Sequence, residues 1–270
     1  MDNRPIGVFD SGLGGLTALK ELELALPGES LVYFGDTGRV PYGSRSREIV
    51  RSYAKQDMSF LLSKNVKAVL AACGTVSSTA ADLGAALPVP YFDVVTPTAK
   101  AAAAATKNGK VGVIGTNATI HSDSYRKALL AERYDLEVFS APCPLFVPLV
   151  ENAFVSPQDE VTRLVAERYL APIREAGVDT LILGCTHYPI IAPIIGSVMG
   201  RAVTLIDSGK EAALALSNAL RERDLLCDGN AKRTVSYFVT DTPENFAAVA
   251  ELFLGHPVSE QTERINIERY

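Results

Sequence analysis

Two cysteines in matching surroundings are the residues of this chain best suited to chemistry. Cys73 closes the apolar run 66–72, and Cys185 closes the similar run 178–184. Small residues that begin a new segment follow each of them, and a helix that starts directly after a strand exposes N–H groups that favour a thiolate. A sulfur with a pKa near neutrality can both remove and deliver a proton. The pair is therefore a candidate for proton exchange at one carbon, with a sulfur on each side.

Other interpretations of the cysteines stay open at this point. A redox disulfide commonly uses a CxxC pair, which the chain lacks. Zinc could be bound by Cys73, Cys185 and His187, although the paired ligands of structural zinc sites are missing. A thiol hydrolase would need one cysteine and a histidine, and it would leave the second cysteine without a task. Cys143 and Cys227 have no counterpart in the repeat described next, and we expect them to be structural.

The cysteines belong to a repeat of two segments that occur in the same order. Residues 7–11 match residues 112–116, with a glycine, apolar strand residues and then a small hydroxyl residue. Residues 66–73 align without gaps on residues 178–185. The order, residue types and similar spacing predict a structural duplication. Ligands in open α/β sheets bind beyond the carboxyl ends of the strands, so both cysteines would face one cleft.

Alternating short apolar runs and amphipathic segments predict an α/β fold. Such alternation is typical of βαβ units and parallel sheets. We expect two pseudo-symmetric α/β domains with mostly parallel sheets that face an interdomain cleft. The first would comprise residues 1–97 plus 208–270, and the second residues 98–207. Predicted strands are residues 6–9, 31–34, 66–70, 111–114, 181–183, 203–206 and 233–239, and predicted helices are 45–64, 100–106, 157–175, 210–223 and 245–254.

Composition narrows the class of protein. Among 270 residues, 47% are hydrophobic and 21% charged, which is the balance of a packed globular enzyme and excludes a disordered chain. The net charge of −5, without a long basic run, argues against nucleic acid as a partner. Apolar stretches are strand-length or interrupted, so we expect no membrane span. Four cysteines are too few for a disulfide scaffold and predict a cytoplasmic protein with reduced thiols.

Polar residues near the predicted strand ends complete the candidate site. Asp10 could hold a proton for Cys73 or bind a substrate ammonium group, or it could cap the following helix. His187 could share a proton with Cys185. The glycine-rich stretch 10–15 fits neither GxGxxG nor a P-loop, so it carries little phosphate signal. We expect hydroxyl groups near the strand ends to bind a substrate carboxylate: Ser11, Thr75, Thr116, Thr119 and Thr186.

Five segments of the chain resemble those of bacterial glutamate racemases. They are GVFDSGLGGLT (7–17), VPYGSRS (40–46), AACGTVSS (71–78), GVIGTNATIHSDSY (112–125) and LGCTHYP (183–189). The resemblance implies an isomerase that interconverts L- and D-glutamate without a cofactor or metal and supplies D-glutamate for peptidoglycan. It also implies a homodimer.

The resemblance also assigns roles residue by residue. Cys73 and Cys185 would be the two catalytic acid–base groups, with Asp10, Glu151 and His187 in support. The substrate site would be lined by Asp10, Ser11, Tyr42, Gly43, Gly74, Thr75, Thr186 and His187. One position departs from the family, because Cys73-Gly74-Thr75 stands where the family commonly has CNT. An aspartate racemase of the same family, or a two-domain binder of small carboxylates without catalysis, is the alternative.

Overall fold

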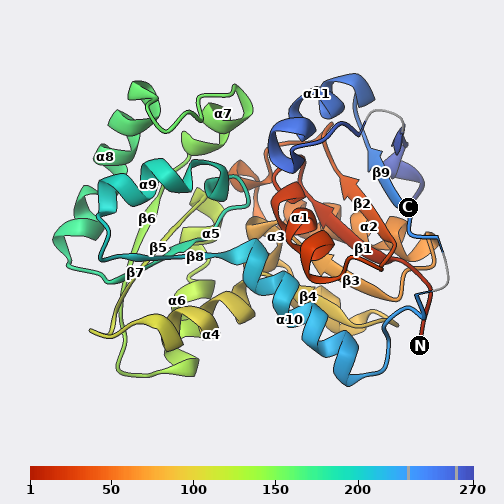
Figure 1. Ribbon diagram of the computed structural model, residues 1–270, viewed down its shortest axis with the longest axis horizontal. Helices are drawn as coiled ribbons and strands as arrows, with labels where there is room; N and C mark the ends of the chain where they lie inside the picture. Colours follow the sequence, from red (N-terminus) through yellow and green to blue (C-terminus); the bar gives the residue numbers. More distant parts are fainter. Residues whose placement is uncertain (230–231, 259–260) are drawn as a thin grey trace.

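The chain folds into two parallel sheets that lie side by side, each with helices on both faces (Figure 1). This arrangement is a computed structural model, which describes residues 1–229, 232–258 and 261–270. Every strand pair in these ranges is parallel. The predicted α/β class with parallel sheets is therefore confirmed. Within the same ranges, no helix combines the length and the apolarity needed to cross a bilayer.

The two sheets share a strand order. In the described residues the first sheet has the order β10-β9-β2-β1-β3-β4 and the second the order β6-β5-β7-β8. Four strands of the first sheet thus correspond to the whole second sheet, and β9 and β10 extend it beyond β2. The first sheet contains β1 (Ile6–Asp10), β2 (Leu31–Gly35), β3 (Ala68–Ala71), β4 (Tyr91–Asp93), β9 (Val235–Val239) and β10 (Thr262–Arg264), and the second contains β5 (Lys110–Gly115), β6 (Glu137–Pro142), β7 (Thr180–Leu183) and β8 (Thr204–Asp207).

The pairing register repeats as well. Gly7 of β1 pairs with Val69 of β3, and Gly112 of β5 pairs with Leu181 of β7. These are the positions that the sequence repeat aligns. Just beyond each pair, the residue before the cysteine donates its N–H to the central strand, from Ala72 to the Phe9 carbonyl at 2.9 Å and from Gly184 to the Ile114 carbonyl at 2.8 Å. The duplication therefore extends to individual backbone hydrogen bonds and delivers both cysteines to equivalent places.

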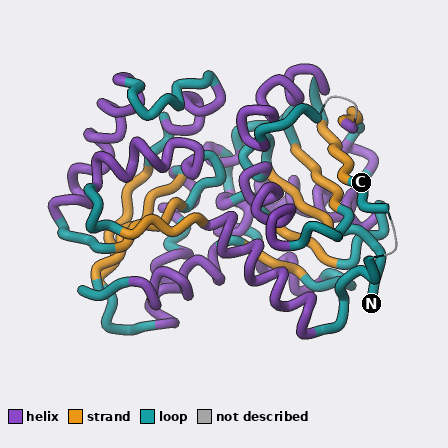
Figure 2. The backbone as a smooth tube through the Cα atoms, viewed as in Figure 1, coloured by secondary structure: helices purple, strands orange, loops and turns teal. Residues whose placement is uncertain are grey.

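The inner strands β1, β2, β3 and β7 are buried along their whole length, and strands covered on both faces read as unbroken hydrophobic runs. In β3, Ala68 and Leu70 join one core cluster, while Val69 and Ala71 join another on the opposite face. Figure 2 shows the helices around the strands in both halves. The helices are α1 (Leu16–Ala25), α2 (Arg47–Ser63), α3 (Gly74–Thr79), α4 (Val95–Ala105), α5 (Asn117–His121), α6 (Ser124–Glu132), α7 (Phe146–Glu151), α8 (Glu160–Glu175), α9 (Ala192–Met199), α10 (Ser208–Glu222) and α11 (Pro243–Leu254).

Most predicted elements are confirmed, and the three missed strands share a physical cause. The strand runs and the five helix segments fall on observed elements, including the alanine-rich run, which lies in α4. The strands β4, β6 and β10 were not predicted. Each lies at the edge of its sheet, and their residues are only partly buried or exposed. An edge strand of this kind lacks the fully apolar pattern of a covered strand.

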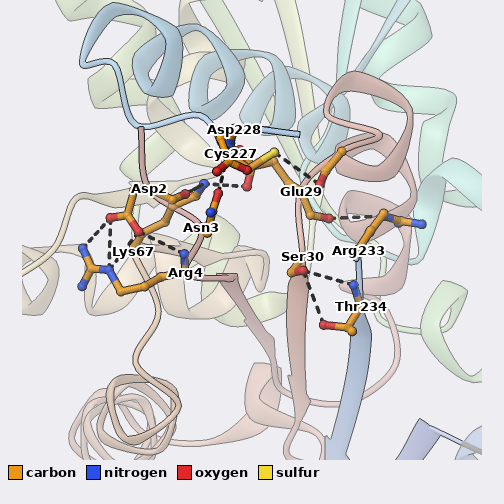
Figure 3. Close-up of polar contacts among 11 residues, drawn as sticks. Asp2, Asn3, Arg4, Glu29, Ser30, Lys67, Cys227, Asp228, Arg233 and Thr234 are labelled. Atoms are coloured by element: carbon orange, nitrogen blue, oxygen red, sulfur yellow. Dashed lines mark hydrogen bonds and ion pairs between the residues drawn. The ribbon is translucent and has the colours of Figure 1, made fainter. Parts of the chain in front are cut away.

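The amino ends of the first sheet are held by a buried ion pair (Figure 3). Lys67, just before β3, has its Nζ 2.5 Å from Glu29 Oε2, and both side chains are almost fully buried. The same Nζ donates to the Asp2 carbonyl at 2.7 Å. Glu29 Oε1 accepts the backbone N–H of Cys227 at 2.8 Å. The pair therefore joins the start of the chain, two strand entries and the segment that leads to β9.

We expect Lys67→Met to lower the free energy of unfolding by about 3–5 kcal/mol, because Glu29 would stay buried without its cation. The double variant Lys67→Met/Glu29→Leu should recover part of that loss, because no uncompensated charge remains. Urea unfolding measures both. The control is Arg163→Ala, which removes an exposed helix pair with Glu167 and should cost less than about 1 kcal/mol. An equal cost for Lys67→Met and the control would contradict the expectation.

Candidate active site

The carboxyl ends of strands from both sheets open into one cavity of about 350 Å³. Loops after β1, β2 and β3 form one wall, and loops after β5, β6 and β7 form the other. This volume lies within the range of small-molecule sites, about 300–1,000 Å³. The lining residues are Ser11, Gly12, Leu13, Val40, Pro41, Tyr42, Gly43, Ser44, Cys73, Gly74, Thr75, Thr116, Asn117, Pro144, Val147, Pro148, Glu151, Gly184, Cys185, Thr186 and His187.

Cys73 sits between the end of β3 and the first turn of α3. Its sulfur donates to Ser11 Oγ at 3.6 Å, and only 4% of the residue is exposed. Burial and the nearby Asp10 carboxylate raise the pKa of the Cys73 thiol to about 12. Asp10 Oδ2 accepts the Gly12 N–H at 2.9 Å, while Oδ1 has no hydrogen-bond partner among the described residues. Burial also raises the pKa of Asp10. These surroundings favour the protonated thiol.

Cys185 has a different partner. Its sulfur lies 3.9 Å from His187 Nδ1, and His187 Nε2 lies 2.9 Å from Glu151 Oε1. Burial opposes a charge on the ring, but the Cys185 sulfur and the Glu151 carboxylate outweigh it and raise the pKa of His187 to about 10. An imidazolium beside a sulfur stabilises its thiolate. The two sulfurs thus have different surroundings: a hydroxyl group and a buried carboxyl group near Cys73, and a charged imidazole ring beside Cys185.

Threonine side chains join the two halves at and beside the cavity. Thr75 Oγ1, from the first half, lies 3.1 Å from Thr116 Oγ1 of the second, which lies 3.0 Å from Thr119 Oγ1. Thr17 Oγ1 donates across the same junction to the Thr186 carbonyl at 3.0 Å. Hydroxyl groups can rotate to donate to an anion. The junction therefore offers donors to a carboxylate at the place where both halves meet.

Most of the predicted site residues come together in this cavity. Two predicted substrate residues do not line it. Asp10 lies behind the 11–12 turn, and Thr119 lies behind Thr116. Those that line it are Ser11, Tyr42, Gly43, Cys73, Gly74, Thr75, Thr116, Glu151, Cys185, Thr186 and His187.

Sequence reasoning missed residues from two parts of the wall. Pro144, Val147 and Pro148 follow β6, and Asn117 begins α5. Because β6 was not recognised as a strand, residues 144–148 were not expected at the functional edge, although the family resemblance named Glu151 at the end of α7. A proline directly after Cys143 was the available signal. All four cysteines are free thiols, and the described residues contain no cluster of three His, Cys, Asp or Glu side chains suited to a metal.

A two-sheet α/β protein with two thiols in one cavity between the sheets is the class that this geometry defines. The Asp/Glu/Hydantoin racemase family model matches residues 20–216. A glutamate racemase of Geobacter metallireducens is 46% identical over 253 residues, which cover 93% of each chain. A crystal structure of a Bacillus anthracis glutamate racemase superposes with a TM-score of 0.93 at 38% identity, covering 98% of each chain. That of Francisella tularensis, in complex with D-glutamate, gives 0.92 at 40% identity over the whole of both chains.

The chain belongs to the Asp/Glu/Hydantoin racemase family. It is accordingly an amino-acid racemase, as its motifs predicted.

A substitution at Gly74 tests how closely the two halves must approach each other. A Cβ at this position would lie 2.5 Å from the Gly184 carbonyl oxygen. We expect Gly74→Ala to lower the free energy of unfolding by about 1–3 kcal/mol, as overpacking does. It should lower kcat/KM at least about tenfold, because a displacement of the neighbouring sulfur by 1 Å can cost about 100-fold.

The matched control is Gly196→Ala in α9, where the nearest atom, Leu205 Cδ1, would lie at an ordinary 3.6 Å. It should keep full activity and gain up to about 1 kcal/mol from helix propensity. Thermal unfolding and initial rates measure both variants. Wild-type activity and stability in Gly74→Ala would show that the approach of the two backbones is not limiting.

Proposed function

We propose that the protein interconverts L- and D-glutamate without a cofactor, using Cys73 and Cys185 as the two acid–base groups. The observation that carries the proposal is the arrival of two thiols, from equivalent strand ends of a duplicated fold, in one cavity. The relatives that cover nearly the whole chain are named glutamate racemases, which favours glutamate over aspartate.

The reaction needs one base and one acid on opposite faces of Cα. A thiolate takes the α-proton, so the Cα–H bond breaks, an S–H bond forms and the electron pair stays on the substrate. The opposite thiol then gives its proton to the other face of the planar carbon. The two sulfurs have exchanged protonation states, and the reverse reaction runs by the same steps with their roles swapped. The raised pKa of Cys73 suits this residue to the role of the acid in one direction, and the His187 imidazolium lies where it would support Cys185 as the base.

The α-proton of an amino acid is weakly acidic, so the carbanion needs stabilisation by the protein. Preorganised donors in a closed site provide it. We assign the substrate carboxylate to the hydroxyl groups of Ser11, Thr75, Thr116 and Thr186, with Thr119 supporting Thr116. Asp10 supports Cys73, and the His187–Glu151 pair supports Cys185.

Closure of two domains would complete the site. We propose residues 1–97 plus 208–270 as one and residues 98–207 as the other, with the cavity between them. Contacts such as Thr75–Thr116 and Thr17–Thr186 hold the closed form. Closure excludes water and sets the distance between the sulfurs. Supply of D-glutamate to peptidoglycan, a cytoplasmic location and a homodimer remain predictions of the resemblance.

Cys73→Ser and Cys185→Ser should each lower racemisation of L-glutamate by at least about 100-fold, because each removes one acid–base group. In D2O, the wild type should place deuterium at Cα of the product without added cofactor, while binding measured by calorimetry persists in both variants. Optical rotation and NMR follow the two signals. The control is Cys227→Ser, a cysteine outside the cavity.

Unchanged racemisation and exchange in both variants would defeat the two-thiol scheme. Binding without any exchange in the wild type would instead identify a carboxylate-binding protein. The substrate is decided by comparing kcat/KM for glutamate with kcat/KM for aspartate. A higher value for aspartate would overturn the glutamate assignment.

His187→Gln should lower kcat/KM at pH 7 by about 10- to 100-fold, within the range of acid–base effects. With a pKa of about 10, the His187 ring is a cation at pH 7 and lies 3.9 Å from the Cys185 sulfur, where it would stabilise negative charge. The neutral amide cannot supply this positive charge, so we expect the rising limb of the pH profile to move to higher pH. The difference from wild type should narrow as the pH approaches 10. Parallel profiles at every pH would contradict this role.

A further inference from the structure

A buried polar cluster lies behind the loop 40–44 that lines the cavity. We define the Tyr42 cluster as Asp36, Arg39, Tyr42 and Asp57. Asp36 follows β2, Asp57 lies on α2, and both are fully buried. Neither carboxyl group lines the cavity, whereas Tyr42 does. The proton-transfer scheme above gives this cluster no task.

The Tyr42 hydroxyl has one proton, but its oxygen lies within hydrogen-bond distance of two carboxyl oxygens. The Tyr42 hydroxyl is hydrogen-bonded to Asp36 Oδ2 and lies 3.0 Å from Asp57 Oδ2. A phenol carries one proton, and an ionised carboxylate carries none. Two hydrogen bonds between three oxygen atoms therefore require a second proton, which one of the carboxyl groups must hold.

The surroundings identify Asp57 as its holder. Asp36 also accepts from Arg39 Nε at 2.5 Å and from Thr240 Oγ1 at 2.9 Å, so it is surrounded by donors, as a carboxylate requires. Asp57 meets Arg39 only through Nη2, at 3.3 Å on its other oxygen. One guanidinium balances one carboxylate, and a second buried anion would be uncompensated. Burial and the neighbouring Asp36 raise the pKa of Asp57 well above its usual value, in agreement with this count.

We propose that Asp57 is a neutral carboxylic acid that donates to Tyr42, that Tyr42 donates to Asp36, and that this directed chain positions the loop 40–44 in the substrate site. Asp36 and Asp57 are thus positioning residues that act through Tyr42. What the loop binds rests on the proposed function, whereas the location of the proton does not.

Two sets of contacts let these hydrogen bonds fix the position of the loop 40–44. Arg39, fixed by Asp36, places its guanidinium 4.0 Å from the centre of the Tyr53 ring and donates to Gln56 Oε1 at 2.6 Å, so the start of the loop is anchored to α2. At the other end, a Cβ on Gly43 would lie 2.9 Å from Thr116 Cβ of the second half. A shift of Tyr42 would therefore move the loop against a threonine of the site.

The test uses two isosteric substitutions that differ only in which carboxyl group becomes an amide. The amide that Asp57→Asn introduces can donate to Tyr42 and accept from Arg39, as a neutral acid does, so this variant should keep KM within about threefold. An amide at position 36 would point a donor at other donors, so Asp36→Asn should raise KM at least about tenfold, with a smaller change in kcat. Asp57→Leu, which cannot donate, should also raise KM, and its contrast with Asp57→Asn is the rescue expected of a positioning residue.

Infrared spectroscopy tests the proton without reference to any substrate. The wild-type protein should show the C=O stretching band of a protonated carboxylic acid that is absent in Asp57→Asn and retained in Asp36→Asn. Loss of the band in Asp36→Asn instead, or failure of Asp57→Asn to fold, would overturn the proposal, as would equal KM values for Asp57→Asn and Asp57→Leu. If glutamate proves not to be the substrate while the band behaves as expected, the proposed function fails and the assignment of the proton stands.

Discussion

The close approach of two backbones at the carboxyl ends of β3 and β7 is the constraint on which the site depends. A Cβ at Gly74 would strike the Gly184 carbonyl oxygen, and a Cβ at Gly14 would strike the side chains of Thr186 and His187. Glycine at position 74 lets the two backbones approach, and glycine at position 14 leaves room for those two side chains. The Thr75–Thr116 contact then closes the gap, and the thiols, each one residue from this junction, face a common space.

The two halves match in backbone and differ in the side chains around their sulfurs. Strand order and register are shared, so each sulfur reaches its place by the same route. Cys73 has a serine hydroxyl and a buried carboxyl group nearby, whereas Cys185 has an imidazole that is oriented by a carboxylate. Duplication therefore explains the equivalent positions of the two sulfurs, and divergence explains their different surroundings.

Fold and thiol pair could be predicted because their causes are local. Unbroken apolar runs mark strands covered on both faces, and the alignment of 66–73 on 178–185 locates the cysteines. The edge strand β6 could not be predicted, because its half-exposed residues lack that pattern, and Pro144 and Val147 were lost with it. The Asp36–Tyr42–Asp57 contacts depend on α2 packing beside the loop after β2, so no spacing in the sequence indicates them.

The path of the chain between the halves has a consequence for synthesis. The second sheet uses only the continuous stretch from β5 to β8, whereas the first sheet is completed when β9 pairs with β2, about two hundred residues later in the sequence. On the ribosome, the second sheet can therefore assemble fully while β2 still has an open edge. The open edge of β2 could pair with another strand in the nascent chain and so cause aggregation. It must therefore be protected until β9 emerges, although in the folded protein β9 covers it.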